Sequence, residues 1–420
     1  MAQEKKKPKT LSARQATLKV VQLLRRRGYQ ALFAGGCVRD MLLGKRPHDY
    51  DVATNASPDE VTCLFPRTLT VGAQFGVIIV LQYGQQIEVA TFRSDSCYCD
   101  GRHPERVVFT DARHDAQRRD FTINGMFYDP FEETVIDYVG GQKDLEKKII
   151  RAIGNPHARF TEDRLRMLRA LRFAARFNFD IEPITWDAIC AGASRLPEIS
   201  AERIVAELEM MLVDPNRGRA AEMAFASGLL NTALPGMTGE QLSLGKSVLA
   251  QLPERCSFAL ALAALLADGT AKQANAVCRH LKCSNELRRQ VSWLVGYRQE
   301  LLNAVPMSKG QLKQWLAEPL FESLRQLNRV YIKSVSGSEA KLRQLSHQIK
   351  QLGDEPIAPP RLLNGHELIQ SGATPGPMVG QLAEELYLAQ LENQVKTKAD
   401  AQTWVAQWLI RHNPNKQANL

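Results

Sequence analysis

Two aspartates separated by one residue are the first groups in the sequence that could carry out chemistry. Asp49 and Asp51 alternate with Tyr50 and Val52 in a predicted strand, so both carboxylates face the same side. Two like charges repel each other unless a cation lies between them, and oxygen ligands with room for water suit Mg²⁺. The pair is a candidate magnesium site, although a D-x-D pattern alone more often marks a solvated strand end.

The segment just before these aspartates could hold a phosphate group. Residues 31–34 are apolar and predict a short buried strand, after which Gly35 and Gly36 permit a tight turn. A helix is predicted from about Cys37, and its first backbone N–H groups have no partner inside the helix and favour an anion. Arg39 adds a positive charge, so this stretch is a candidate phosphate cradle.

A third carboxylate could join the aspartate pair from a predicted hairpin. Glu88 lies in the second strand of that hairpin, which residues 77–82 and 87–92 form around Gly84. If the hairpin lies beside the aspartate strand, Glu88 completes a carboxylate triad. An exposed glutamate on a strand face is the more ordinary interpretation of the same residue.

Two polar segments follow without a regular pattern. Residues 94–106 predict a loop. Further on, Arg119, Asp120 and Asn124 gather two hydrogen-bonding groups and a positive charge near a predicted helix start. A basic surface would explain this second group equally well, so the residues alone leave its role open.

Asp163 and Arg166 are three residues apart on a helix predicted over residues 162–176, which places them on one face. A surface ion pair is the commoner explanation for such a spacing. An Asp acceptor and an Arg donor nevertheless match the amino group and ring nitrogen that cytosine and adenine both present. Uracil and guanine would leave both partners wrongly paired, so the two residues could select a base.

The elements that position these groups divide the chain into a mixed part and a helical part. Helix and strand patterns alternate up to about residue 153, and only helical patterns follow Gly154, which predicts the α+β class. With 420 residues, of which 44% are hydrophobic, the chain can build several subdomains. We predict four parts, at residues 1–150, 151–215, 216–355 and 356–420.

Composition restricts the partners and the compartment. The net charge of +9 favours a polyanionic partner without proving one. None of the eight cysteines forms a C-x-x-C pair, so we expect reduced thiols. The basic N-terminus is not followed by an apolar run with a cleavage site, and no segment predicts a membrane span. We therefore expect a cytoplasmic protein.

Five motifs in a fixed order carry a resemblance to a known family. They are GGCVRDMLLG…DYDVAT, IEVATFR, RRDFTING, DYVGGQKDL and EDRLRMLRALRFAA. Together they resemble the bacterial-type class II nucleotidyltransferases of the DNA polymerase β superfamily, which include CCA-adding tRNA nucleotidyltransferases and bacterial poly(A) polymerases. The resemblance covers about residues 15–215, with a weaker match near 362–395. It implies a polymerase β-like head with a mixed sheet, followed by an all-α neck, body and tail.

The resemblance also implies roles for the candidate residues. Asp49, Asp51 and Glu88 would be the catalytic carboxylates, with Mg²⁺ held by the two aspartates. The implied nucleotide-binding residues are Gly35, Gly36, Arg39, Arg119, Asp120, Asn124, Asp163 and Arg166. Of these, Asp163 and Arg166 would select CTP and ATP, and a helix over residues 199–212 would support them. The chain departs from the family pattern at Arg164, where proline is usual, and at Gly125, where alanine is usual.

The implied reaction is template-independent addition of CCA to the 3′ end of tRNA, from CTP and ATP, with release of pyrophosphate. The helical parts would grip the acceptor stem. The segment before Phe75 lacks the basic pair typical of poly(A) polymerases, and the full length of residues 94–106 argues against a CC-adding enzyme. An enzyme that adds only the terminal A and a poly(A) polymerase stay open as alternatives, as does a catalytically idle RNA-binding protein of the same fold.

Overall fold

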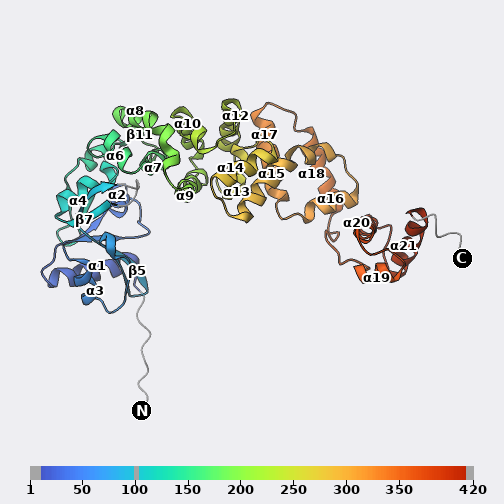
Figure 1. Cartoon of the computed structure of the whole chain (residues 1–420), viewed down its shortest axis with the longest axis horizontal. Helices are drawn as coiled ribbons and strands as arrows, with labels where there is room; N and C mark the ends of the chain where they lie inside the picture. The colour runs from blue at the N-terminus through green and yellow to red at the C-terminus, as the bar shows by residue number, and fades with distance from the viewer. Residues whose placement is uncertain (1–10, 99–103, 413–420) are drawn as a thin grey trace, which may run out of the picture. The chain divides into compact units, whose positions relative to one another are not determined.

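The computed structural model describes residues 11–98 and 104–412, which are coloured along the chain in Figure 1. The chain divides into two compact units. One consists of Met1–Ser243 with Val277–Cys283, and the other of Leu244–Ala276 with Ser284–Leu420. No helix within the described ranges is long and apolar enough to cross a membrane. The four-part division stays a prediction.

A seven-stranded mixed sheet forms the centre of the N-terminal head, in the order β3-β4-β5-β2-β1-β8-β9. Strands β2 and β5 run parallel, and the other neighbouring pairs run antiparallel. The predicted mixed sheet is therefore confirmed. The strands are β1 (Ala31–Ala34), β2 (Asp51–Thr54), β3 (Thr68–Gly72), β4 (Val77–Gln82), β5 (Gln85–Thr91), β8 (Met126–Asp129) and β9 (Thr134–Asp137).

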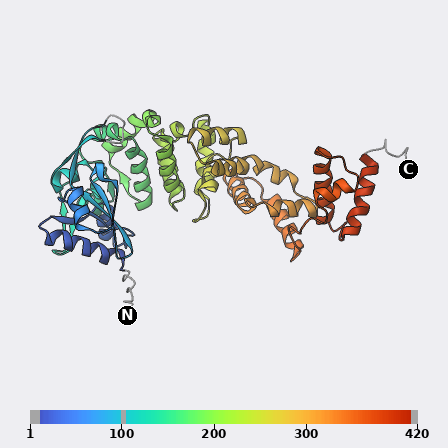
Figure 2. The ribbon, with the colours of Figure 1, turned by 60° about the horizontal axis from the view of Figure 1, so that its bottom comes forward.

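Helix α1 (Ala13–Arg26) packs against this sheet through an apolar stripe that includes Val20 and Leu24. Ser12 caps its N-terminus in a capping box with Gln15. Figure 2 shows α1 in dark blue along one side of the blue strands. The head also contains α2 (Gly36–Leu42), α3 (Pro58–Leu64), α4 (Ala112–Arg118), α5 (Gly141–Glu146) and the 3₁₀ turns η1 (Ala73–Phe75) and η2 (Thr122–Asn124).

A β-hairpin stands where the sequence predicted a loop over residues 94–106. Strands β6 (Arg93–Tyr98) and β7 (Pro104–Phe109) pair antiparallel, with Ser94 opposite Val108. The loop prediction was wrong because these polar residues lack the alternation of apolar residues by which a strand is predicted. Cross-strand hydrogen bonds stabilise the hairpin instead. The intervening residues 99–103 of the predicted loop lie outside the described ranges.

The neck corrects a second prediction, the single helix over residues 162–176. The backbone breaks at Asp163, where φ is −147° and ψ is 104°, so two helices form instead of one. A two-stranded parallel pair, β10 (Ile149–Ile150) with β11 (Asp180–Ile181), also places a strand after Gly154, where none was expected. The neck elements are α6 (Pro156–Glu162), α7 (Leu165–Phe177), α8 (Pro183–Gly192), η3 (Ala193–Glu198) and α9 (Ala201–Leu212), and they are followed by α10 (Arg217–Ala226) and α11 (Leu229–Ala233).

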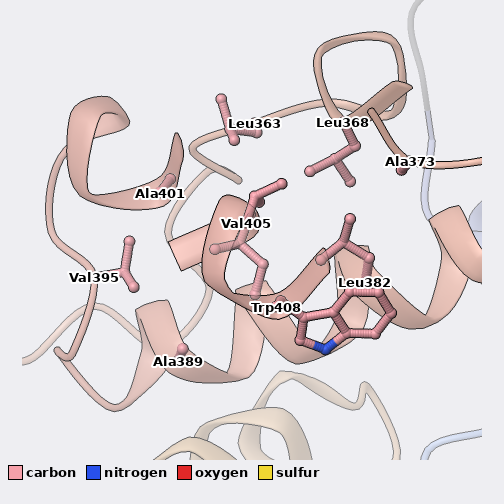
Figure 3. Packing of buried hydrophobic residues seen from close by; sticks show 10 residues of the cluster. Leu363, Leu368, Ala373, Leu382, Ala389, Val395, Ala401, Val405 and Trp408 are labelled. Carbon is pink, nitrogen blue, oxygen red and sulfur yellow. The ribbon is translucent and has the colours of Figure 1, made fainter. Parts of the chain in front are cut away.

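The remainder of the described chain is helical, as predicted. Its last three helices, α19 (Gly365–Gln370), α20 (Pro377–Leu391) and α21 (Lys398–His412), enclose a small apolar core that includes Leu368, Leu382 and Trp408 (Figure 3). The preceding helices are α12 (Gly239–Ala250), α13 (Phe258–Leu265), α14 (Ala271–His280), α15 (Asn285–Ala304), α16 (Lys309–Ala317), α17 (Phe321–Ser334) and α18 (Ala340–Leu352).

Candidate active site

The sheet register brings Glu88 to the aspartate pair. Val52 of β2 lies beside Val89 of the parallel strand β5, so Asp51 lies beside Glu88 on the same face. Asp49 precedes β2 and is exposed, whereas Tyr50 and Val52 point into the protein. The burial of the side chains therefore alternates along this segment as predicted, although the strand itself begins only at Asp51.

Burial and the neighbouring carboxylates make Asp51 harder to ionise. Burial of Asp51 and the negative charge of Glu88 raise the pKa of Asp51 to about 6 against the effect of Arg119, and Asp49 adds to the rise. A divalent cation between these groups would relieve the repulsion, so their chemistry fits Mg²⁺. Within residues 11–98 and 104–412, no three His, Cys, Asp or Glu side chains form a ready-made cage for a metal ion. Magnesium commonly uses one or two carboxylates together with substrate phosphates, and this arrangement allows that.

The glycine turn leaves room for Arg119, whose charge acts on Asp51. Gly35 has φ of +72°, and a Cβ at this position would lie 2.9 Å from Nη1 of Arg119. The Nε and Nη2 atoms of Arg119 donate to Asp115 at 3.1 and 2.9 Å, which fixes the guanidinium in place. The positive charge of Arg119 lowers the pKa of Asp51, so the turn, the arginine and the carboxylates form one site.

Arg39 is buried and links the turn to the segment around Asn124. Its Nη1 donates to Oδ1 of Asn124 at 2.7 Å, and its Nε donates to Asp40 at 2.8 Å. The guanidinium lies 3.5 Å from the position that a Cβ at Gly36 would take, and it stacks over the ring of Phe177 at 4.5 Å. The predicted cradle residues therefore lie together, but the Arg39 charge is already partly compensated by Asp40.

Asp120 connects the head with the neck. Nδ2 of Asn124 donates to its carboxylate at 3.0 Å, and Arg169 of α7 donates to it twice, at 2.9 and 2.7 Å. Burial would raise the pKa of Asp120, but Arg169, Asn124 and the charge of Arg166 lower it to about 2. The carboxylate of Asp120 therefore orients its neighbours rather than standing free.

Asp163 and Arg166 do not share a helix face, contrary to the prediction. Asp163 ends α6, where its carboxylate accepts from the N–H of Leu165 at 3.0 Å and from Arg203 at 2.8 Å. Arg166 lies in the first turn of α7 and donates to Glu162 at 2.8 Å. The prediction failed because a short Asp side chain competes for backbone N–H groups and so interrupts a helix.

Sequence reasoning missed the residues that hold these groups in place. Arg203 of α9 binds Asp163, and Glu207, one turn further on, accepts from Arg169 at 3.4 Å and Arg172 at 2.7 Å. Arg203 and Glu207 are four residues apart, which places them on one face of a helix, and this spacing is the sequence signal that could have identified them. Helix α9 thus supports α7, as expected of a helix over residues 199–212.

The two departures from the family pattern also have local explanations. Arg164 donates from Nη1 to the carbonyl oxygens of Phe160 and Thr161, at 3.1 Å each, which satisfies the end of α6. A Cβ at Gly125 would lie 2.7 Å from Cγ2 of Val139, so alanine would not fit there without movement. Neither change touches a candidate reacting group.

Three parts of the chain match models of known protein families, which define the class of protein. The poly A polymerase head domain matches residues 31–151, the probable RNA and SrmB-binding site of polymerase A matches residues 178–240, and the putative tRNA nucleotidyltransferase domain 2 matches residues 254–405. The fold described above is therefore that of a nucleotidyltransferase with a poly(A) polymerase-type head.

Similarity to individual proteins and solved structures identifies the family within this class. The chain is 36% identical to a CCA-adding enzyme of Levilactobacillus brevis, over 90% of this chain and 92% of that protein. It is 31% identical to one of Geobacillus stearothermophilus, over 96% of this chain and 98% of the other. A crystal structure of the Bacillus stearothermophilus CCA-adding enzyme in complex with CTP matches with a TM-score of 0.77 at 28% identity, over 97% of this chain and 100% of that chain. The chain belongs to the CCA-adding enzyme family of nucleotidyltransferases.

Proposed function

We propose that the protein adds CCA to the 3′ end of tRNA from CTP and ATP and releases pyrophosphate. The observation that carries this proposal is the placement of Asp51 beside Glu88, next to the turn at Gly35 and the guanidinium of Arg119. Family membership over nine-tenths of the chain supports it from a second direction.

The residues divide the work of nucleotidyl transfer. Asp49 and Asp51 would hold Mg²⁺, and Glu88 adds a third negative charge on the same face. Mg²⁺ bound by these residues would supply positive charge beside the attacking 3′-hydroxyl and the departing pyrophosphate. The open N–H groups at Gly36 and Cys37, together with Arg119, bind the triphosphate and hold its α-phosphate in line with the attacking oxygen.

Nucleotide choice falls to Asp163 and Arg166. The carboxylate of Asp163 accepts from an exocyclic amino group, and Arg166 donates to the neighbouring ring nitrogen, which CTP and ATP present and UTP and GTP do not. Arg203 holds Asp163 at 2.8 Å, and Glu162 holds Arg166 at 2.8 Å, so each group is oriented before a base enters. No nucleic acid template is needed because the protein supplies both hydrogen-bonding groups.

Pyrophosphate release tests the proposal. Wild-type protein with Mg²⁺, CTP, ATP and tRNA that lacks its 3′ CCA should release pyrophosphate, and the Asp49→Ala and Asp51→Ala variants should not. Both variants should still bind tRNA, because neither aspartate belongs to the RNA-gripping parts of the chain. Absence of release by the wild-type protein would favour the idle RNA-binding alternative, and turnover by either variant would contradict the metal assignment.

A further inference from the structure

A basic cavity lies on the side of the sheet opposite the candidate carboxylates. It measures about 600 Å³, and its lining includes Ser12, Arg14, Arg46, His48 and Tyr50. Because side chains alternate along the strand, Tyr50 points away from the side to which Asp49 and Asp51 point. Its ring lies edge-on against Phe33 at 5.3 Å, on the side where α1 packs. The cavity is therefore distinct from the nucleotide site.

The cavity gathers positive charge that nothing in the described chain neutralises. Arg14 and Arg46 are both exposed, and neither forms an ion pair or side-chain hydrogen bond with residues 11–98 or 104–412. His48 is exposed beside them, and the described residues that line the cavity include no carboxylate. Structural arginines usually pair with an acidic group, as Arg25 does with Asp129 at 2.5 Å. The lining is therefore suited to an anion from outside.

The start of α1 adds donors of the same kind. Ser12 accepts from the N–H of Gln15 at 3.4 Å, and the N–H of Ala16 donates to the carbonyl of Ser12 at 2.9 Å. The N–H groups of Ala13 and Arg14 have no acceptor inside the helix and lie at the positive end of its dipole. This 14-residue helix therefore presents backbone donors where Arg14 begins to line the cavity.

Tyr50 provides an independent sign of a ligand. The residue is only 8% exposed and lines the cavity, yet its hydroxyl has no hydrogen-bond partner in the described part of the chain. The hydroxyl is not among the fully buried polar atoms of the described chain, so it opens onto the cavity and can bond an oxygen atom placed there.

We infer that this cavity, lined by Arg14, Arg46, His48 and Tyr50, binds a phosphate group. Two guanidinium groups, a helix N-terminus and a phenol hydroxyl together match the charge and the acceptor oxygens of a phosphate. The volume admits a whole nucleotide unit, so the phosphate can belong to an RNA backbone as well as to a free phosphate ion. The RNA source rests on the proposed function, whereas the chemistry of the site does not.

The test compares an Arg14→Ala/Arg46→Ala variant with a matched Arg26→Ala/Arg27→Ala control. The control removes the same charge from the exposed residues at the other end of α1. For each protein we would measure thermal stabilisation by inorganic phosphate, and tRNA affinity across a series of salt concentrations. Tyr50→Phe, which keeps the ring and removes only the hydroxyl, provides a third variant that retains the packing on Phe33.

If the occupant is an RNA phosphate, the double variant should bind tRNA about tenfold more weakly and lose about one unit of salt slope, unlike the control. If the occupant is a free phosphate, tRNA affinity should persist and the stabilisation by phosphate should disappear. Either result supports the site, with Tyr50→Phe giving a smaller effect of the same kind. Equal behaviour of the double variant and the control in both measurements would overturn the inference. Pyrophosphate release by the wild-type protein is scored separately, so failure of the proposed function would not be mistaken for failure of this site.

Discussion

Removing Arg169 should destabilise the junction between head and neck. In Arg169→Ala the carboxylate of Asp120, which is 11% exposed at its side chain, loses two hydrogen bonds of 2.9 and 2.7 Å. Breaking a buried ion pair costs about 3 to 5 kcal/mol. Arg169 is itself 32% exposed, and Asn124 still binds Asp120, so we expect a value at the lower end, about 3 kcal/mol. For a unit of this size that corresponds to a fall in Tm of about 6 to 12 °C.

The loss should depend on pH with a definite sign. The pKa of Asp120 is about 2 in the folded protein and lies below its ordinary value, so the ionised group stabilises the fold at neutral pH. That stabilisation declines as the pH falls through the folded pKa. In Arg169→Ala the charge of Arg169 no longer opposes the effect of burial, so the pKa of Asp120 rises. As the pH falls, Asp120 is therefore protonated at a higher pH in the variant than in the wild type, and protonation removes the unpaired buried charge. The difference in Tm between wild type and variant should therefore be smaller near pH 4 than near pH 7.

Thermal unfolding of wild type, Arg169→Ala and a control measures both effects. Lys282→Ala is the control, because the ion pair of Lys282 with Glu202 has side chains that are 63% and 59% exposed. An ion pair this exposed contributes little to the free energy of unfolding, so its loss should change that free energy by less than about 0.5 kcal/mol. An Arg169→Ala effect no larger than that of Lys282→Ala would refute the reasoning, as would a Tm difference that is the same at both pH values.

Two other variants address the nucleotide site. Gly35→Ala should abolish incorporation with little loss of tRNA affinity, because φ of +72° and a 2.9 Å approach to Arg119 exclude a Cβ; nucleotide and tRNA binding measured separately would check this. Arg203→Ala should lower the preference for CTP over UTP by roughly tenfold to a hundredfold, because Asp163 loses the donor that orients it. Competition between the two nucleotides measures that preference, and an unchanged ratio would show that Arg203 is a packing residue.

Local sequence signals predicted the elements that lie in the head core. The strand limits at residues 31–34 and 77–82 agree with the structure, because runs of apolar residues bounded by glycine leave few alternatives. The position of Glu88 beside Asp51 depends on pairing between strands far apart in sequence. The residues alone could only suggest that pairing, and the resemblance to a family made it a firm expectation.

The failures share a physical cause. The hairpin of β6 and β7 and the helix break at Asp163 both depend on specific hydrogen bonds. The spacing of apolar residues in the sequence does not reveal such bonds. The phosphate cavity was missed for a related reason. Arg14 and Arg46 are thirty-two residues apart, and only the packing of α1 on the sheet brings them together.

The most direct test of the proposed function is the product made from a tRNA that ends at its discriminator base. Extension with CTP and ATP together, resolved on a sequencing gel, should add two C residues and one A and then stop. The same tRNA ending in CC should receive a single A. Extension of the CC-ended tRNA alone would make the protein an A-adding enzyme, and a long ladder with ATP alone would make it a poly(A) polymerase.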